Sequence, residues 1–271
     1  MVRSLWTAAS GMIAQQTNVD TIANNLSNVN TTGYKTEVAE FKTLLYQNLQ
    51  TRTTTANGAN KPIGAQVGLG VRNSAITSMF KQGSLYESSS DSAFAIQGDG
   101  FFAVRGEDGE TCYTRNGNFV WAVDGDNLTL STTDGRYVLD SNGNKISFGS
   151  NYVMSRITIS ADGTVCYPDE NNNAQSLGIT IGLYQFQNPS GLDKLEESLY
   201  RVTDASGEAM NEATNAALTK SSVAQGYLEG SNVQVADEMV NLIVAQRAYE
   251  MNSKAIQTTD DMMQQANNLR R

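Results

Sequence analysis

The sequence predicts an α+β protein with long N- and C-terminal helices packed as a coiled-coil-like unit and an antiparallel all-β domain inserted between them. Apolar residues recur at three- and four-residue steps from Leu5 to Val29 and again from Val235 to Met263, as on one face of a helix. Between these segments the period changes to two, and Asp-Gly or Asn-Gly dipeptides recur every eight to ten residues. Such dipeptides are strong hairpin signals. The 271 residues suffice to bury a substantial core.

The N-terminal helix is predicted from Ser4 to Gly33, because glycine readily takes the left-handed conformation that ends a helix. Further helical turns are expected in 34–46, so that 1–46 form the N-terminal half of an inner helical domain. The expected interface positions of this half are Leu5, Met12, Val19, Ile22, Leu26 and Val29.

Polar residues interrupt this helix at Gln15, Asn24, Asn25 and Asn28. Asparagine lowers helix propensity, so these residues need an explanation. They either coat a solvent-exposed face or form hydrogen bonds to neighbouring chains in an assembly.

Residues 47–92 are rich in Thr, Asn and Gly and predict an extended linker or arm, with a composition that favours disorder in the free chain. Residues 93–203 predict an antiparallel β-domain of eight to ten strands. Residues 204–230 show no clear period and predict a return linker. A C-terminal helical part, 231–271, is expected to begin at a cap formed by Ser231 and Asn232.

The C-terminal helix carries more apolar surface than one partner helix covers. Its predicted seam is Val235, Leu242, Tyr249, Ile256 and Met263. Further apolar residues lie outside that seam: Met239, Ile243, Met251 and Met262. Leaving each of these side chains in water forgoes about 1.5–3 kcal/mol of burial. The pattern therefore predicts self-assembly through the terminal helices.

The composition excludes several functional classes. Histidine is absent, which removes the Ser-His-Asp and Cys-His arrangements and the histidine-containing zinc sites. The net charge of −9 lies almost wholly in the middle of the chain, and no basic cluster suits nucleic acid. Nothing reaches the roughly 20 apolar residues of a membrane span, and no secretory signal is expected at the N-terminus.

The remaining candidates for chemistry are weak. Residues 124–135 resemble the start of a calcium loop, but its sixth position is Thr129 and its twelfth is Gly135. Cys112 and Cys166 are either apolar fillers of strands or a disulfide pair, and the sequence does not decide. We expect no metal and no cofactor. A secreted glycan hydrolase that uses two carboxylates is the alternative from another class.

Seven stretches, in three groups, resemble the axial proteins of the bacterial flagellum, which build its rod and hook. The stretches are Ala9–Gln16 with Asp20–Lys35, Gly98–Phe102 with Tyr113–Gly117, and Ser231–Val233 with Glu238–Asn241 and Gln246–Glu250. Because they span essentially the whole chain, the resemblance implies a structural subunit and no enzyme. The opening Arg3–Trp6, the length and the segment 46–70 are most similar to subunits of the distal rod. A proximal rod subunit or a Gram-positive paralogue is the alternative within the family.

The resemblance also implies an assembly. We expect a homo-oligomeric helical tube in the flagellar basal body, with the terminal helices around a central export channel. In the segment 46–70, marked by Tyr46, Pro62, Gly64 and Gly70, we expect an arm that braces neighbouring subunits and keeps the rod straight. The implied partners are proximal rod proteins, the hook protein, the flagellar type III exporter and, in a Gram-negative source, the bushing ring proteins.

Overall fold

The structure, a computed structural model, describes residues 2–50, 65–149, 152–169 and 173–269. It consists of two compact units. Unit 1 comprises Met1–Ser27, Glu37–Thr77 and Gln234–Arg271, and unit 2 comprises Asn28–Thr36 and Ser78–Val233. The predicted class, α+β with two terminal helices and an antiparallel β-domain, is confirmed.

The first helix, α1 (Val2–Ser27), ends six residues before the predicted end at Gly33. Beyond it the chain turns, with the Thr31 hydroxyl donating to Asn28 Oδ1 at 3.0 Å. Such local side-chain bonds compete with the helix, which is why asparagine and threonine favour its end. Gly33 does have a positive φ of 71°, as expected. Its lack of a side chain serves a different purpose, because a Cβ there would overlap the backbone at Arg115 and Asn116.

The second part of unit 1 is a two-stranded antiparallel ribbon, here called the arm. Strand β1 (Glu37–Thr43) pairs with β4 (Val71–Ser78), and β2 (Tyr46–Gln50) pairs with β3 (Ala65–Gly68). The prediction of further helical turns in 34–46 is therefore wrong. The apolar residues Val38 and Phe41 that suggested a helix lie in β1, where β-branched and aromatic side chains are favoured.

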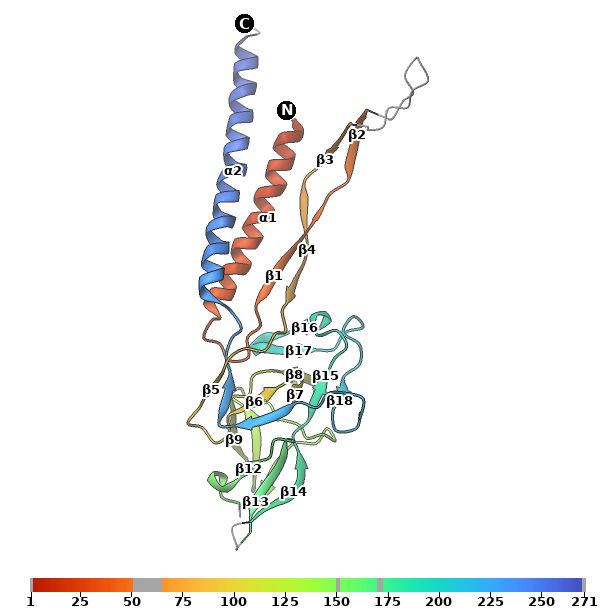
Figure 1. Ribbon diagram of the computed structural model, residues 1–271, viewed down its shortest axis with the longest axis vertical. Helices are drawn as coiled ribbons and strands as arrows, with labels where there is room; N and C mark the ends of the chain where they lie inside the picture. The colour runs from red at the N-terminus through yellow and green to blue at the C-terminus, as the bar shows by residue number, and fades with distance from the viewer. Residues whose placement is uncertain (1, 51–64, 150–151, 170–172, 270–271) are drawn as a thin grey trace. The chain divides into compact units, whose positions relative to one another are not determined.

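The last helix, α2 (Val235–Asn268), begins three residues after the predicted cap. Its N-cap is Gln234, which makes no side-chain cap bond, and Asp237 and Glu238 in the first turn favour the positive end of the helix dipole. In unit 1, α1 lies between α2 and the arm (Figure 1). Within the part of the chain that the structure describes, no helix is long and apolar enough to cross a membrane.

Unit 2 is built from antiparallel sheets. A six-stranded sheet has the order β16-β17-β8-β7-β15-β18, two three-stranded sheets have the orders β11-β10-β9 and β12-β13-β14, and two pairs are β19-β6 and β20-β5. The strands are β5 (Leu85–Glu87), β6 (Phe94–Gln97), β7 (Phe101–Arg105), β8 (Thr111–Thr114), β9 (Phe119–Asp124), β10 (Asn127–Thr132), β11 (Ser147–Gly149), β12 (Thr158–Ile159), β13 (Thr164–Pro168), β14 (Ala174–Thr180), β15 (Leu183–Gln185), β16 (Asp193–Lys194), β17 (Leu199–Arg201), β18 (Met210–Asn211), β19 (Ser222–Gln225) and β20 (Tyr227–Glu229).

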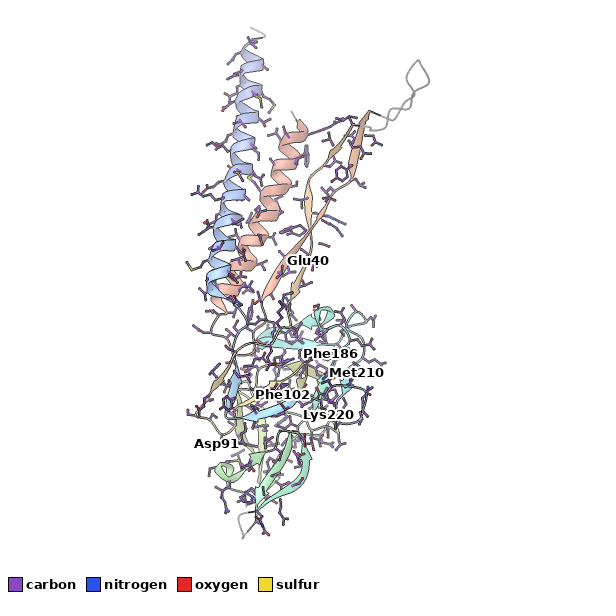
Figure 2. The ribbon with its side chains drawn as sticks, in the orientation of Figure 1. Glu40, Asp91, Phe102, Phe186, Met210 and Lys220 are labelled. Carbon is purple, nitrogen blue, oxygen red and sulfur yellow. The ribbon has the colours of Figure 1, made fainter. Side chains whose placement is uncertain are left out.

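The core of unit 2 lies on both faces of β7. Successive strand residues point to opposite faces, so Phe102 joins the larger apolar cluster and Phe101 joins a smaller one with Phe186. Figure 2 shows Phe102 and Phe186 in the interior of this unit. Because both faces are covered, the first four residues of β7 are all apolar and buried, without the alternation of a half-exposed strand.

Two predictions about unit 2 need correction. Twelve strands lie between Phe94 and Arg201 in the described residues, more than the eight to ten expected. The expected return linker, 204–230, contains β18, β19 and β20, which pair with β15, β6 and β5. Unit 2 thus extends well beyond the expected 93–203.

The predicted hairpin glycines behave as expected at most positions, with positive φ at Gly109, Gly125, Gly135, Gly143 and Gly163. Gly117 differs, because a Cβ there would overlap the carbonyl of Phe94. Asn116-Gly117 is therefore a site of close backbone approach.

Candidate assembly surface

The two terminal helices meet through small and polar side chains. The buried residues of α1 are Ala8, Ala14, Thr21, Ile22 and Asn25, and those of α2 are Glu238, Ala245 and Thr259. At Gly11 the helices approach so closely that a Cβ would come within 2.8 Å of Asn252 Nδ2. The contact between α1 and α2 therefore buries few of the large apolar side chains.

The predicted seam residues consequently remain largely uncovered. Only Ile22 is buried. The half-buried members are Leu5, Met12, Val19, Leu26, Val29, Leu242, Ile256 and Met263, while Val235 and Tyr249 are exposed. The buried positions of α2 lie four residues before or three after the predicted seam, which places that seam at the edge of the intrachain contact.

A wide apolar surface is left on both helices. On α1 the exposed side chains include Trp6, with 71% of its surface accessible, and Ile13, with 66%. On α2 they include Met239, Val240, Ile243, Val244, Met251 and Met262. The seven-residue search missed Trp6, Ile13, Val240 and Val244. The spacing of four between Met239 and Ile243, and between Val240 and Val244, was the signal that could have identified a second stripe.

Two predicted interface residues line a hollow of about 380 Å³ in unit 1. Val19 of α1 and Tyr249 of α2 form its apolar part, and Gln16, Gln246 and Glu250 form its polar rim. The structure therefore brings these two halves of the predicted interface together at the surface of the helix pair.

The polar residues proposed for contacts between chains behave differently from one another. Asn25 is only 1% exposed, and its amide bonds within the chain. Asn25 Nδ2 donates to the Glu37 carbonyl at 2.8 Å and to Glu238 Oε2 at 3.3 Å, and Asn25 Oδ1 accepts from the Glu37 amide at 2.9 Å. Its assignment as an inter-subunit contact is wrong, because its side chain is buried and used within unit 1.

The other three polar candidates keep some accessible surface. Asn24 is exposed and donates to Glu37 Oε2 at 3.4 Å. Gln15 is half-buried, as is Asn28, which accepts from Thr31 in the turn after α1. These three remain predictions for contacts between copies.

The arm is held against α1 at two places. At one, Glu37 bonds Asn25, as described. At the other, the Ser10 hydroxyl accepts from the Val71 amide at 3.3 Å, and a Cβ at Gly70 would overlap Ser10 Oγ. Gly70 has a φ of 118°, a conformation that side-chain-bearing residues rarely adopt. The predicted arm residue Gly70 is thus the point where the arm lies against α1.

Beyond these contacts the arm exposes apolar side chains along most of its length: Val38, Phe41, Leu45, Tyr46, Leu49, Leu69 and Ile76. Glu40 on β1 accepts from the Thr77 hydroxyl across the ribbon (Figure 2). The predicted residues Pro62 and Gly64 lie outside the described residues. A two-stranded ribbon in isolation is marginally stable, so an arm of this kind gains from a covering partner.

Chemistry of other kinds has little support in the described part of the chain. No group of three or more Asp, Glu or Cys side chains is close enough to hold a metal ion there. Cys112 and Cys166 are both free and buried, and burial raises the pKa of the Cys112 thiol. Both cysteines therefore act as small apolar side chains in β8 and β13.

The fold and this surface define a class of chains with terminal helices, an inserted β-domain and exposed apolar helix faces. Three family models match: "Flagella basal body rod protein" over 5–35, "Flagellar hook protein FlgE/F/G D1 domain" over 95–167 and "Flagellar basal body rod FlgEFG protein C-terminal" over 224–269. The class is thus that of the flagellar rod and hook proteins.

Relatives that match this chain over nearly their full length define the family within this class. A protein of Borreliella burgdorferi described as "Flagellar basal-body rod protein FlgG" is 45% identical, with all of both chains covered. Proteins with the same description are 41% identical in Agrobacterium fabrum, over 96% of this chain and 97% of the relative, and 36% identical in Bacillus subtilis, over all of both. The chain belongs to the flagellar basal-body rod protein family, whose members are structural proteins of the flagellum.

Proposed function

We propose that the chain is a structural subunit of the distal rod that self-assembles into a helical tube, encloses the export channel and transmits torque. The observation that carries this proposal is the apolar surface of unit 1, which α1, α2 and the arm all leave exposed. Scattered exposed apolar residues are ordinary, but continuous stripes on neighbouring elements indicate a contact surface. Open helical assemblies need such heterologous surfaces, because one face of a subunit meets a different face of the next.

The inner layer of this tube is proposed to consist of the terminal helices in coiled-coil-like packing. The spacing of the buried α2 residues supports it, since Glu238, Ala245 and Thr259 are separated by seven and fourteen residues, with half-buried Asn252 between them. A seven-residue repeat is the basis of coiled-coil contact. We propose that the predicted seam, from Leu5 to Val29 and from Val235 to Met263, contacts other copies through its half-buried and exposed residues.

We propose that the arm braces neighbouring subunits and keeps the rod straight. Its anchoring on α1 through Gly70 and Val71 supports a fixed direction for the ribbon. Its exposed residues Leu45, Tyr46 and Leu49 then provide the contact with a neighbour. Gln15, Asn24 and Asn28 are proposed to make polar contacts in the same assembly.

The expected partners are proximal rod proteins, the hook protein, the flagellar type III exporter and, in a Gram-negative source, the bushing ring proteins. The family names of the relatives support a place among other flagellar components.

We propose no enzymatic activity, and the glycan hydrolase alternative has no support in the comparisons. The alternatives of a proximal subunit or a Gram-positive paralogue are not favoured by the relatives reported above.

The substitution Leu242→Asp tests the proposed interface. Leu242 is half-buried on α2, so a carboxylate there must be desolvated when copies assemble, at a cost of several kcal/mol. Each 1.4 kcal/mol raises the concentration needed for assembly about tenfold. We expect the variant to stay monomeric where the unchanged chain forms sedimentable tubes, and to abolish motility in cells.

The control is Gln257→Asp, which introduces the same charge at an exposed polar position of α2. It should leave assembly and motility nearly unchanged. Near-ultraviolet circular dichroism of both variants should retain the signal of the aromatic core of unit 2. Normal tubes from the Leu242→Asp chain contradict the interface, and peptidoglycan digestion by the unchanged chain supports the hydrolase alternative.

A further inference from the structure

Unit 2 contains a buried ionic cluster in which one carboxylate holds two cations. Lys35, Glu229 and Arg115 have side chains that are 0%, 0% and 2% exposed. Lys35 Nζ lies 2.6 Å from Glu229 Oε1, and Arg115 Nη1 lies 3.4 Å from Glu229 Oε2. Lys and Glu side chains are rarely fully buried in proteins unless they are paired, so this cluster needs a structural explanation.

Other polar atoms of the cluster bond the backbone around it, except Arg115 Nε, which is buried without a hydrogen-bond partner among the described residues. Lys35 Nζ also donates to the Lys81 carbonyl at 2.8 Å, and Arg115 Nη2 donates to the Gly98 carbonyl at 2.7 Å. Glu229 Oε1 accepts a second bond from the Gly83 amide at 2.9 Å. The carboxylate of Glu229 thereby connects stretches of chain that are far apart in the sequence.

A second side chain repeats this connection a few residues away. Asn232 Oδ1 accepts from the Thr36 amide and hydroxyl, both at 2.7 Å, and Asn232 Nδ2 donates to the Met79 and Lys81 carbonyls. This explains why Asn232 does not cap α2 as predicted. Both acceptor and donor of its amide are used inside unit 2.

The backbones of these stretches also meet directly. The Gly33 amide donates to the Glu229 carbonyl at 2.8 Å, the Met79 amide to the Thr36 carbonyl at 2.8 Å, and the Gly230 amide to the Ser84 carbonyl at 2.8 Å. A Cβ at Gly83 would overlap the carbonyl of Gly230. Residues 33–36, 79–84 and 229–232 therefore form one hydrogen-bonded junction, called here the closure junction.

We propose that Glu229 closes unit 2, so that the stretch following α1 and the stretch preceding α2 become ordered together and neither docks stably without the other. Without Glu229, the buried side chains of Lys35 and Arg115 lose the carboxylate that pairs with both of them. The charges of Asp99 and Glu212 still act on Arg115. Removal of one partner from a buried ion pair is strongly destabilising, whereas an exposed pair contributes little. Unit 2 therefore remains open at this junction until residues 229–232 have joined residues 33–36 and 79–84.

Burial is also reflected in the titration of the two cations. Desolvation lowers the pKa of Lys35 and of Arg115, and the charge of Glu229 opposes the shift in both. The charge of Glu229 thus offsets part of the cost of burying the two cations.

The test is amide hydrogen exchange on the full-length chain with Glu229→Gln, which keeps the shape and removes the charge. Four amides report on the junction: Gly33, Thr36, Met79 and Gly83. We expect all four to exchange roughly 100-fold or more faster, because opening of the junction becomes easier. Amides of β7 and β8 should change less than about tenfold. Asp193→Asn, which removes an exposed ion pair with Arg201 in the same unit, is the matched control and should change none of them.

The decisive reporters are Thr36 and Met79, since neither amide bonds Glu229. Faster exchange confined to Gly33 and Gly83 shows only a local effect and overturns the proposal. An equal loss of protection in β7 and β8 also overturns it, because the cluster then supports the whole unit and not its closure. The double variant with Lys35→Met and Glu229→Gln should lose less opening free energy at the junction than the sum of the losses in the two single variants. Strict additivity of the two losses contradicts the coupling.

Discussion

At the scale of single residues, unit 1 depends on a small number of polar side chains placed between its elements. Asn25 is the clearest case, since its amide bonds both the arm at Glu37 and α2 at Glu238. Glu238 is itself buried, and a buried carboxylate requires hydrogen bonds. One asparagine thereby fixes three elements with respect to one another.

Asn24 and Asn25 offer a matched pair for a substitution test. Asn25→Ala removes the hydrogen bonds of a buried side chain to the Glu37 backbone and to the Glu238 carboxylate, so we expect a loss of about 2–3 kcal/mol in the opening free energy of α1. Asn24→Ala at the exposed neighbouring position should cost less than about 0.5 kcal/mol. Hydrogen exchange of α1 amides measures both.

The two variants should also separate stability from assembly. If Asn24 contacts another copy, as we propose, Asn24→Ala weakens tube formation while leaving α1 as stable as before. Equal stability losses for the two variants contradict the intrachain role assigned to Asn25.

At the scale of elements, the arm owes its direction to close packing on α1. Gly70 is the only described arm residue with a positive φ, and Ser10 occupies the space where its side chain would lie. Because two effects act at one residue, the contact should be sensitive to a single methyl group.

Gly70→Ala should detach this part of the arm from α1. The positive φ and the overlap with Ser10 together should cost at least about 2 kcal/mol. Gly68→Ala is the control, because its Cβ would sit 3.4 Å from the Tyr46 ring, an ordinary contact, and Gly68 has no positive φ. Exchange of the Val71 amide, which bonds Ser10, measures the difference.

We also expect the Gly70→Ala chain to give rods that are less straight or less stable, since the arm is proposed to brace neighbours. Straight rods of normal stability from that variant, with the arm demonstrably detached, contradict the bracing role.

At the scale of the whole molecule, the secondary-structure elements could be predicted from the sequence better than the contacts between them. Both terminal helices, most strands of unit 2 and most turn glycines followed from local periodicity and turn chemistry. The arm strands did not, because Val38 and Phe41 are three residues apart, as on one face of a helix, and pairing with β4 overrides this local signal. The end of α1 was misplaced for a similar reason. Gly33 is required by close packing against the backbone at Arg115 and Asn116, and it does not mark the end of the helix.

The assembly surface was predictable only in part. A heptad search finds apolar positions but does not say which of them the chain covers itself. In the structure α1 and α2 meet through Gly11, Ala14 and Ala245, and the larger residues stay available. The closure junction could not be predicted from the sequence, because Lys35 and Glu229 are 194 residues apart and no local pattern indicates that either is buried.

The central claim is that the apolar faces of the terminal helices are covered by other copies of this chain. A cryo-electron microscopy map of the assembled rod, resolved well enough to place side chains, tests it most directly. We predict α1 and α2 in the inner layer of the tube, with Trp6, Ile13, Ile243 and Val244 buried between subunits. A map in which these four side chains face solvent or the open channel contradicts the account.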